Sequence, residues 1–308
     1  MREARNFKNI LVMRGGALGD FVLTLPALAA LRKSFPAARL EILGYPRIAA
    51  LAVAGGLAEA AHSIEAPALA RYFAANAPGT NRFAGYDLIV SYIFDPETVF
   101  EENVRREAPG AVFLKGPHRP DESGSIHATD VLLQPLRELG IEEADSEPRL
   151  KLSSEAERRG WLALHPGSGS EHKNWPEANW GGLIREIIEK TRWNCLLVGG
   201  EAEVGRLERL PNFDTGRSKF CRIELAQNLP LVELARILQG CAGFVGHDSG
   251  VTHLAAAVGL PGLALWGETN ANVWSPRSNR MKLIRHDKGL SRLPVEDVFG
   301  KLAELGIV

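Results

Sequence analysis

The chain has 308 residues, of which 45% are hydrophobic and 24% charged, so its composition is that of a globular protein and its length favours two domains. Its formal net charge of −1 excludes a nucleic-acid-binding protein that relies on a broad basic surface. Its three cysteines, Cys195, Cys221 and Cys241, form no Cys-x-x-Cys pair, which predicts reduced thiols and neither a disulfide framework nor a thiolate zinc site.

No segment near the start has the pattern of a secretory signal or a membrane span. The apolar run at residues 10–13 is interrupted by Arg14. The longest apolar stretch, residues 21–32, contains Pro26 and is shorter than the about 20 residues that a spanning helix needs. We therefore expect a cytoplasmic protein.

The first half of the sequence alternates strand-like and helix-like segments. Short continuous apolar runs predict buried strands at residues 9–13, 39–44, 86–93 and 111–116. Helical patterns occupy residues 20–34 and 127–140. Residues 141–160 are polar and charged with few large apolar side chains, which predicts a linker.

The same alternation restarts after the linker. Strand-then-glycine patterns lie at residues 161–167, 193–200, 243–250 and 263–268. Helices are predicted at residues 177–191, after residue 250 and at about 294–304. Two such series predict an α/β fold of two Rossmann-like domains, residues 1–150 and 151–290, with parallel sheets facing a central cleft. Residues 291–308 are expected to form a helix that packs back on the first domain.

Ligands in open parallel sheets bind at the carboxyl ends of the strands, and the first such end carries a glycine-rich turn. Gly15, Gly16 and Gly19 lack the spacing of the G-x-G-x-x-G dinucleotide fingerprint, which argues against a Rossmann oxidoreductase. Asp20 follows them at the start of a predicted helix. Its carboxylate has two interpretations, a helix N-cap or a general base for an incoming hydroxyl.

A Pro-Gly-Ser-Gly loop leaves the first strand of the second half. Gly167 and Gly169 allow backbone amides to approach a ligand. Lys173 can reach anionic oxygens as a point charge, although a solvated surface lysine is the alternative.

Three further polar residues in this half are weaker candidates. Packing or surface exposure explains His165 and His172. Glu201 begins a predicted helix, where capping and the helix dipole explain an acid, and contact with a sugar hydroxyl is the alternative interpretation.

A helix beginning near Ser249 predicts a site for phosphates, because its first backbone N–H groups and its positive dipole end face the ligand side. Ser249, Gly250 and Thr252 are small enough for close approach, and His253 is placed with them on the phosphate side. A carboxylate pointed at phosphates would repel them, so Asp248 is expected to turn aside and accept hydrogen bonds from sugar hydroxyls. This division of roles fits a nucleotide-diphosphate sugar.

Three segments resemble the lipopolysaccharide heptosyltransferase family, glycosyltransferase family nine: ILVMRGGALGDFVLTLPALAALRKSFP, LHPGSGSEHKNWPEANW and VGHDSGVTHLAAAVGLPGLALWGETN. The resemblance runs from about residue 9 to residue 270, while residues 45–125 carry no clear family signal. It implies a GT-B fold in which the first domain binds the acceptor and the second binds the nucleotide sugar. It also implies inverting, metal-independent transfer, without a cofactor, from ADP-heptose to an inner-core sugar of lipopolysaccharide.

The resemblance assigns roles to individual residues. Asp20 matches the catalytic aspartate of the family, and Lys173 matches its lysine before a Trp-Pro pair. The segment from Asp248 to His253 matches a D-T-G-x-x-H motif, with serine in place of threonine. The predicted substrate-binding residues are Gly19, Ser168, Gly169, Glu201, Asp248, Ser249, Gly250, Thr252 and His253.

Two other functions stay open on the sequence. A nucleotide-sugar epimerase or hydrolase of GT-B fold would need a second acid/base group across the sugar from Asp20, and no candidate is evident. A non-catalytic nucleotide-sugar-binding protein is disfavoured by the presence of both Asp20 and Lys173. We expect a monomer whose partners are a nucleotide-sugar donor and a lipid-linked or oligosaccharide acceptor, with peripheral contact at the inner membrane and no nucleic acid.

Overall fold

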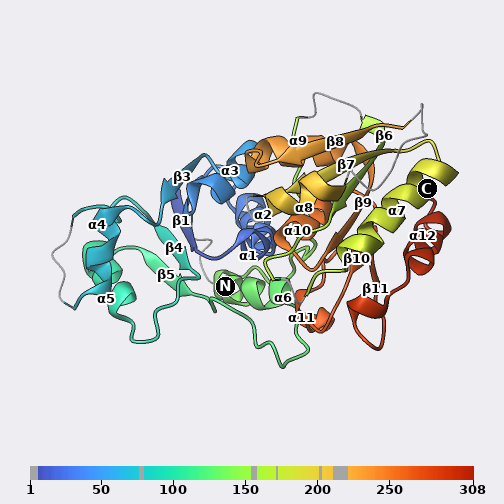
Figure 1. Ribbon diagram of the computed structural model, residues 1–308. Helices are drawn as coiled ribbons and strands as arrows, with labels where there is room; N and C mark the ends of the chain where they lie inside the picture. Colours follow the sequence, from blue (N-terminus) through green and yellow to red (C-terminus); the bar gives the residue numbers. More distant parts are fainter. Residues whose placement is uncertain (1–5, 76–79, 154–157, 171–172, 201–202, 211–220) are drawn as a thin grey trace. The chain divides into compact units, whose positions relative to one another are not determined.

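The chain divides into two compact units, Met1–Pro148 and Arg149–Val308 (Figure 1). The computed structural model describes residues 6–75, 80–153, 158–170, 173–200, 203–210 and 221–308. The division falls inside the polar segment at residues 141–160 that the composition predicts to be a linker.

The first unit is a parallel sheet with helices connecting its strands. Its strands are β1 (Asn9–Arg14), β2 (Arg39–Gly44), β3 (Ala60–Ser63), β4 (Leu88–Ser91) and β5 (Val112–Lys115). Its helices are α1 (Leu18–Val22), α2 (Leu25–Ser34), α3 (Pro46–Ala54), α4 (Pro67–Ala70), α5 (Val99–Glu107) and α6 (Ala128–Leu133). The strand order is β3-β2-β1-β4-β5, so the direction of winding reverses between β1 and β4.

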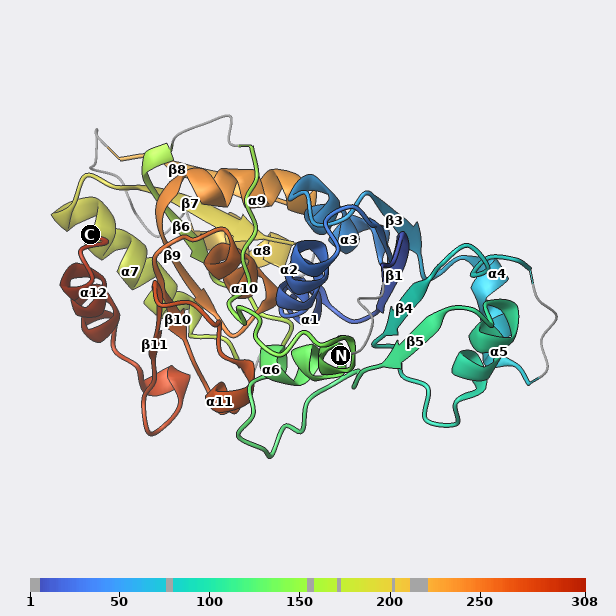
Figure 2. The ribbon, with the colours of Figure 1, turned by 180° about the vertical axis from the view of Figure 1, so that it is seen from behind.

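Two packing layers hold the first unit together. The helix α2 packs against α6, and α3 packs against β2 and β3. A separate apolar cluster joins Leu11, Met13 and Leu43 of the sheet to Phe83 and to Phe100 of α5. In both views α4 and α5 lie side by side (Figures 1 and 2).

Prolines shorten two of the predicted helices. The predicted helix at residues 20–34 is two helices, because Pro26 occupies the second position of α2 and cannot donate a backbone hydrogen bond to the preceding turn. The predicted helix at residues 127–140 ends as α6, and Pro135 opens a 3₁₀ turn at Gln134–Leu139. The edge strand β3 was not predicted, since its sequence, AAHS, has no apolar run.

The second unit is a six-stranded parallel sheet. Its strands are β6 (Arg158–His165), β7 (Asn194–Gly199), β8 (Ile223–Gln227), β9 (Cys241–His247), β10 (Gly262–Leu265) and β11 (Met281–Ile284). Its helices are α7 (Glu177–Lys190), α8 (Val204–Arg209), α9 (Leu231–Gly240), α10 (Gly250–Ala257), α11 (Ala271–Trp274) and α12 (Val295–Glu304). The strand order, β11-β10-β9-β6-β7-β8, is the Rossmann order, and it reverses between β6 and β9. The predicted α/β class with parallel sheets is confirmed.

The C-terminal helix α12 packs on α7, within the second unit (Figures 1 and 2). Val298 and Leu302 are buried in one cluster with Leu183 and Ile187 of α7. The apolar face of α12 is thus covered by its own unit, and the expected packing of residues 291–308 on the first domain stays a prediction.

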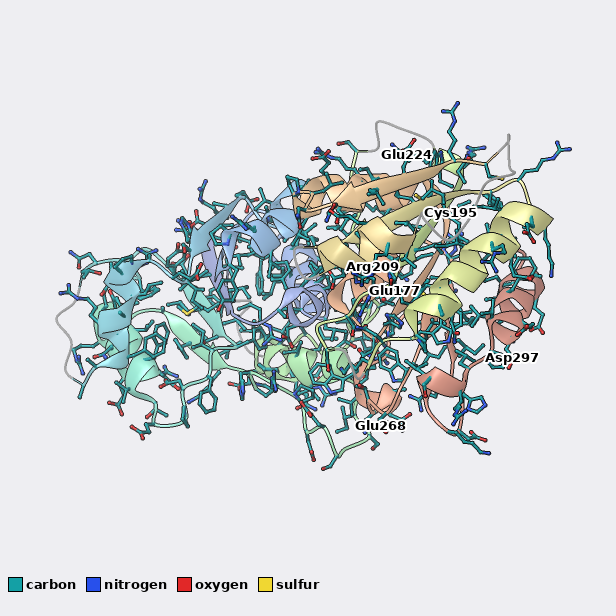
Figure 3. All side chains as sticks on the ribbon, viewed as in Figure 1. Glu177, Cys195, Arg209, Glu224, Glu268 and Asp297 are labelled. Carbon is teal, nitrogen blue, oxygen red and sulfur yellow. The ribbon has the colours of Figure 1, made fainter. Side chains whose placement is uncertain are left out.

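An ion pair fastens the neighbouring helix α8 to the start of α7. Arg209 donates two hydrogen bonds of 2.8 Å to the two carboxylate oxygens of Glu177, and the two side chains point toward each other in Figure 3. The Arg209 guanidinium lowers the pKa of Glu177. The pair lies just after the loop that leaves β6, so it helps to fix the far end of that loop.

Candidate active site

The loops that follow β6 and β9 lie at the switch point of the second sheet. These strands are neighbours, and they end at His165 and His247. Because the connections turn to opposite faces at this point, the two loops diverge, and ligands of open α/β sheets bind at such a point. The predicted residues from Gly167 to Lys173 and from Asp248 to His253 lie in or directly after these two loops, so the structure brings the two motifs together.

Lys173 and Asp248 form an ion pair across the switch point. The Nζ atom of Lys173 lies 2.7 Å from Oδ2 of Asp248, and the two side chains are 42% and 11% exposed. The ammonium group is therefore accessible to a ligand while the carboxylate orients it. The sequence predicted both residues, but it gave no indication that one holds the other.

His247 anchors the loop that carries Lys173, and the sequence analysis missed it. The backbone N–H of Trp175 donates to its Nε2 at 2.7 Å, and its Nδ1 lies 3.2 Å from the carbonyl oxygen of Gly167. Because Nε2 accepts, the proton is on Nδ1, which donates to Gly167. Burial lowers the pKa of His247 to about 3, so the ring is neutral at physiological pH. The available signal was a histidine in the last position of a buried strand, directly before Asp248.

The first turn of α10 presents backbone donors at the same place. Ser249 is the N-cap, and its Oγ accepts the backbone N–H of Thr252 at 3.4 Å. The first N–H groups of a helix have no acceptor within the helix, so those of Gly250 and Val251 are available to an anion. The predicted helix start near Ser249 is confirmed.

Two residues of this motif are turned into the protein. Thr252 is fully buried, and its hydroxyl donates to the carbonyl of His247, so it helps to position the turn, and its contact with substrate stays a prediction. His253 is 6% exposed on the same helix, and its contact with substrate stays a prediction.

The loop after β6 is braced from inside. The Ser168 hydroxyl lies 2.7 Å from the carbonyl oxygen of Ser170 and 2.8 Å from Oδ1 of Asn174, and the residue is 8% exposed. Gly169 is exposed, and a Cβ there would meet nothing within 4 Å. Ser168 therefore holds the loop together, while Gly169 leaves its outer surface open. Direct contact of either residue with substrate stays a prediction.

Glu203 supports this loop and was not predicted. A Cβ at Gly167 would lie 2.2 Å from Cγ of Glu203, so only glycine fits above this side chain. Oε2 of Glu203 accepts the backbone N–H of Gly200 at 2.8 Å. The predicted contact at Glu201 and the weaker candidate His172 lie outside the described residues. His165 is a packed residue, with Nδ1 2.9 Å from the carbonyl of Val198.

Asp20 lies in the first turn of α1, in the first unit. Ala17 is the N-cap and Asp20 is the third helical residue, so Asp20 is not the N-cap itself, but its carboxylate caps the helix start as part of a capping box. Its Oδ2 atom accepts the backbone N–H of Ala17 at 2.9 Å. Gly16 has φ of +94°, and a Cβ there would lie 2.8 Å from the same Oδ2, so glycine is required beside the carboxylate. The adjacent Gly19 occupies the second helical position.

Arg14 holds Asp20 and was not predicted as a site residue. It is 4% exposed at the end of β1, and its Nη1 donates to the carbonyl of His118 at 2.7 Å. Its Nη2 lies 3.6 Å from Oδ1 of Asp20 and 3.3 Å from the backbone oxygen of Asp20. Burial lowers the pKa of Arg14, and the Asp20 carboxylate opposes that effect. The carboxylate is thus fixed through both of its oxygens.

An aromatic pair lies next to Arg14. The rings of Phe94 and His118 have centroids 4.6 Å apart, and Phe94 is 63% exposed. Burial, together with the neighbouring cations Arg119 and Arg14, lowers the pKa of His118. An exposed ring beside a neutral imidazole is a surface on which the apolar face of a sugar can stack.

Neither a metal site nor a membrane span is seen in the described part of the chain. Within the described ranges, no three His, Cys, Asp or Glu side chains are grouped as metal ligands, and metal independence stays a prediction. Among the same residues, no helix is both long and apolar enough to cross a bilayer.

Comparison with known proteins agrees with a two-unit α/β protein. A model of glycosyltransferase family 9 (heptosyltransferase) matches residues 126–302. The chain is 31% identical over 133 residues to lipopolysaccharide heptosyltransferase 1 of Salmonella typhimurium, across 43% of this chain and 40% of that protein. It is 27% identical over 169 residues to lipopolysaccharide heptosyltransferase 2 of Escherichia coli K12, across 53% and 48%. Its structure is similar to that of E. coli heptosyltransferase WaaC with ADP, with a TM-score of 0.77 and 18% identity over 96% of this chain and 99% of that chain.

The family match covers more than half of the chain, so the protein belongs to glycosyltransferase family 9. The structural likeness identifies the fold as GT-B, and the resemblance seen in the sequence is confirmed. The aligned segments span less than half the length of these two curated relatives, at 40% and 48%.

Proposed function

We propose that this protein is an inverting, metal-independent glycosyltransferase that moves heptose from ADP-heptose to a lipopolysaccharide core or related glycan acceptor. The observation that carries this proposal is the accessible Lys173 ammonium at the switch point of the second unit, oriented by Asp248. The backbone N–H groups at the start of α10 come directly after Asp248 in the chain. These donors suit the diphosphate of a nucleotide sugar.

The donors in the second unit act on the leaving group. As the bond from the anomeric carbon to the diphosphate oxygen breaks, negative charge grows on that oxygen. Lys173 and the backbone N–H groups of Gly250 and Val251 stabilise this charge, because preorganised donors need no reorganisation during the reaction. Asp248 accepts hydrogen bonds from the sugar hydroxyls while it orients Lys173.

The first unit supplies the base. Asp20 takes the proton of the acceptor hydroxyl, whose oxygen attacks the anomeric carbon from the face opposite the diphosphate, so the anomeric configuration inverts. One carbon–oxygen bond forms, one breaks, and the proton ends on Asp20. Arg14 fixes the carboxylate for this step. The Phe94–His118 pair stacks against the acceptor sugar, which is lipid-linked and brings the protein to the inner membrane surface.

A donor panel with an acceptor-dependent assay tests this function. Calorimetry should give tighter binding for ADP-heptose than for other nucleotide sugars, and ADP release should require the acceptor. The release should persist in a chelator. ADP-heptose that does not bind, or activity that is abolished by the chelator and restored by magnesium, would contradict the proposal.

The same assay separates the alternatives. Release of free heptose and ADP without an acceptor identifies a hydrolase, and a change in sugar configuration without transfer identifies an epimerase. Binding of ADP-heptose without any turnover identifies a non-catalytic binding protein.

A further inference from the structure

A carboxylate interrupts the apolar side of the first sheet, away from the candidate active site. Glu41 of β2 pairs in register with Leu11 of β1, and Leu43 pairs with His62 of β3. In-register neighbours of a parallel sheet point to the same face, so Glu41 and His62 share a face with these leucines. Leu11 and Leu43 belong to the apolar cluster of this face, so a charged group there needs an explanation.

Protein donors fully occupy the Glu41 carboxylate. The Tyr86 hydroxyl and Nε2 of His62 each bond to Oε2 at 2.7 Å, and Nε of Arg39 bonds to Oε1. Burial opposes ionisation of Glu41, but these hydrogen bonds outweigh burial and lower its pKa to about 2. The carboxylate is therefore ionised and has no role as an acceptor for a ligand. Its effect is to hold His62 and Tyr86 in place.

A second carboxylate fixes the segment that covers this face. Glu107 of α5 accepts the backbone N–H of Thr80 at 3.0 Å and that of Phe83 at 2.7 Å. It also accepts the Tyr72 hydroxyl. The segment from Thr80 to Tyr86 is thus held from both sides, by Glu107 at one end and by Glu41 at the other. The walls that it contributes are preformed.

These walls line an open pocket with a volume of about 200 Å³. Its lining residues are Leu11, Leu43, His62, Arg82, Phe83 and Tyr86. An apolar cavity of about 150 Å³ holds a benzene molecule, so this cavity can hold a six-membered ring together with one small polar group. No lining residue belongs to the candidate active site, and all of them precede residues 126–302, which match the family model.

Arg82 brings a positive charge to the polar wall of the cavity. The guanidinium group of Arg82 makes no hydrogen bond or ion pair with another described residue, and Nδ1 of His62 is likewise without a partner in that part of the chain. Arg82 carries a full positive charge and five donors. The opposite wall is made of Leu11, Leu43 and Phe83, each at most 2% exposed.

We infer that this cavity is a second binding site, for a small organic carboxylate with an apolar ring. The carboxylate group pairs with Arg82, and the ring lies against Leu11, Leu43 and Phe83. A guanidinium group suits a carboxylate because its planar fork makes two parallel hydrogen bonds. The inference does not depend on the proposed transferase function.

Benzoate is the probe that tests this site, by ligand-observed NMR titration of the full chain. We expect saturable binding of one benzoate, with a dissociation constant on the order of 1 mM for a ligand of this size. Benzyl alcohol, which has the ring without the charge, and acetate, which has the charge without the ring, should bind at least about tenfold more weakly.

Variants locate the binding. Arg82→Gln and Arg82→Met should each raise the benzoate dissociation constant at least about tenfold, since a hydrogen-bonded charge is lost. Both should fold, because the Arg82 side chain makes no ion pair with a described residue. Arg47→Gln, on the exposed start of α3, is the matched control and should leave binding unchanged. Absence of saturable binding, wild-type affinity in both Arg82 variants, or benzyl alcohol binding as tightly as benzoate would overturn the inference.

Discussion

Asp20 and Lys173 carry the chemistry in this account, and each is held by a second charged residue. Arg14 lies 3.6 Å from the Asp20 carboxylate, and Asp248 lies 2.7 Å from the Lys173 ammonium. Each pair places one charge and leaves it able to meet a substrate. Substitutions that remove the charge of one residue in each pair test these roles.

Asp20→Asn separates a base from a structural carboxylate. Asparagine can still accept the backbone N–H of Ala17 with its one oxygen, so donor affinity should stay at the wild-type level, whereas the melting temperature should fall because the buried Arg14 loses its counter-charge. Loss of the proton acceptor should lower turnover at least about a hundredfold. Steady-state kinetics and calorimetry measure both quantities. Asp297→Asn, on α12 (Figure 3), is the control and should be silent. Wild-type turnover in Asp20→Asn would leave the mechanism without its base.

Lys173→Ala should weaken ADP binding by about ten- to a hundredfold, because a charged hydrogen-bond donor is removed.

Asp248→Asn should act differently on two ligands. It frees the ammonium for phosphate, so bare ADP should bind at least as tightly, whereas ADP-heptose should lose affinity relative to ADP. Calorimetry with both ligands is the measurement, and substitution of the exposed Lys282 of β11, Lys282→Ala, is the control. Equal losses for ADP and ADP-heptose in Asp248→Asn would refute the assignment of Asp248 to the sugar.

At the scale of elements, the site depends on how β9 holds the loop after β6. His247 accepts from Trp175 and donates to Gly167, so one neutral ring fixes both ends of the loop that carries Lys173. The rings of Trp180 and His247 also pack edge to face, with their centroids 5.3 Å apart. His247 is fully buried, so protonation would break this arrangement.

His247→Phe tests this anchor through pH. The pKa of His247 is about 3 in the folded state and about 6.5 when unfolded, so the unfolded state binds more protons between these values. The stability of the second unit is therefore fully present above pH 6.5 and falls as the pH decreases, by about 2 kcal/mol from this residue between pH 8 and pH 5. The variant should be about 2–4 kcal/mol less stable at pH 8, because two backbone groups lose their partner. Urea unfolding should show this deficit shrink by about 2 kcal/mol at pH 5. A deficit independent of pH would contradict the neutral ring.

Elements with strong local signals could be predicted, and those defined by tertiary contacts could not. The apolar runs of β1, β2 and β9 and the amphipathic α7 identified these elements. Strand β8 was not predicted, because its partly exposed sequence, IELAQ, contains no continuous apolar run. Helix α12 was predicted as an element, but its packing on α7 was not, since an apolar face does not specify which surface covers it.

The same distinction applies to the site. The sequence indicates Gly167, Gly169, Lys173 and Asp248, because they follow strands. At such positions packing alone seldom requires a glycine or a charged residue. Arg14 and His247 occupy buried strand ends, and their roles arise from partners far away in the chain. His118 is 104 residues from Arg14, and Gly167 is 80 residues from His247. No local pattern encodes these distances.

The tryptophans of the whole molecule all lie in the second unit, where the nucleotide-sugar donor is proposed to bind. All six tryptophans lie between Trp161 and Trp274, inside the second unit, so tryptophan fluorescence follows that unit alone. ADP at about 100 times its dissociation constant should stabilise the unit by about 2.7 kcal/mol and raise its fluorescence-monitored melting temperature by about 5–10 °C. An unchanged melting temperature at saturating ADP would contradict donor binding in the second unit.

The mass of the acceptor after reaction shows whether this protein transfers heptose. The purified protein is incubated with ADP-heptose and a lipopolysaccharide core acceptor in a chelator, and the acceptor is analysed by mass spectrometry. If the proposed mechanism is right, the acceptor gains the mass of one heptosyl residue, at a rate that falls at least about a hundredfold in Asp20→Asn. An acceptor of unchanged mass, with ADP-heptose bound intact or hydrolysed to free heptose, would contradict the assignment of this protein as a glycosyltransferase.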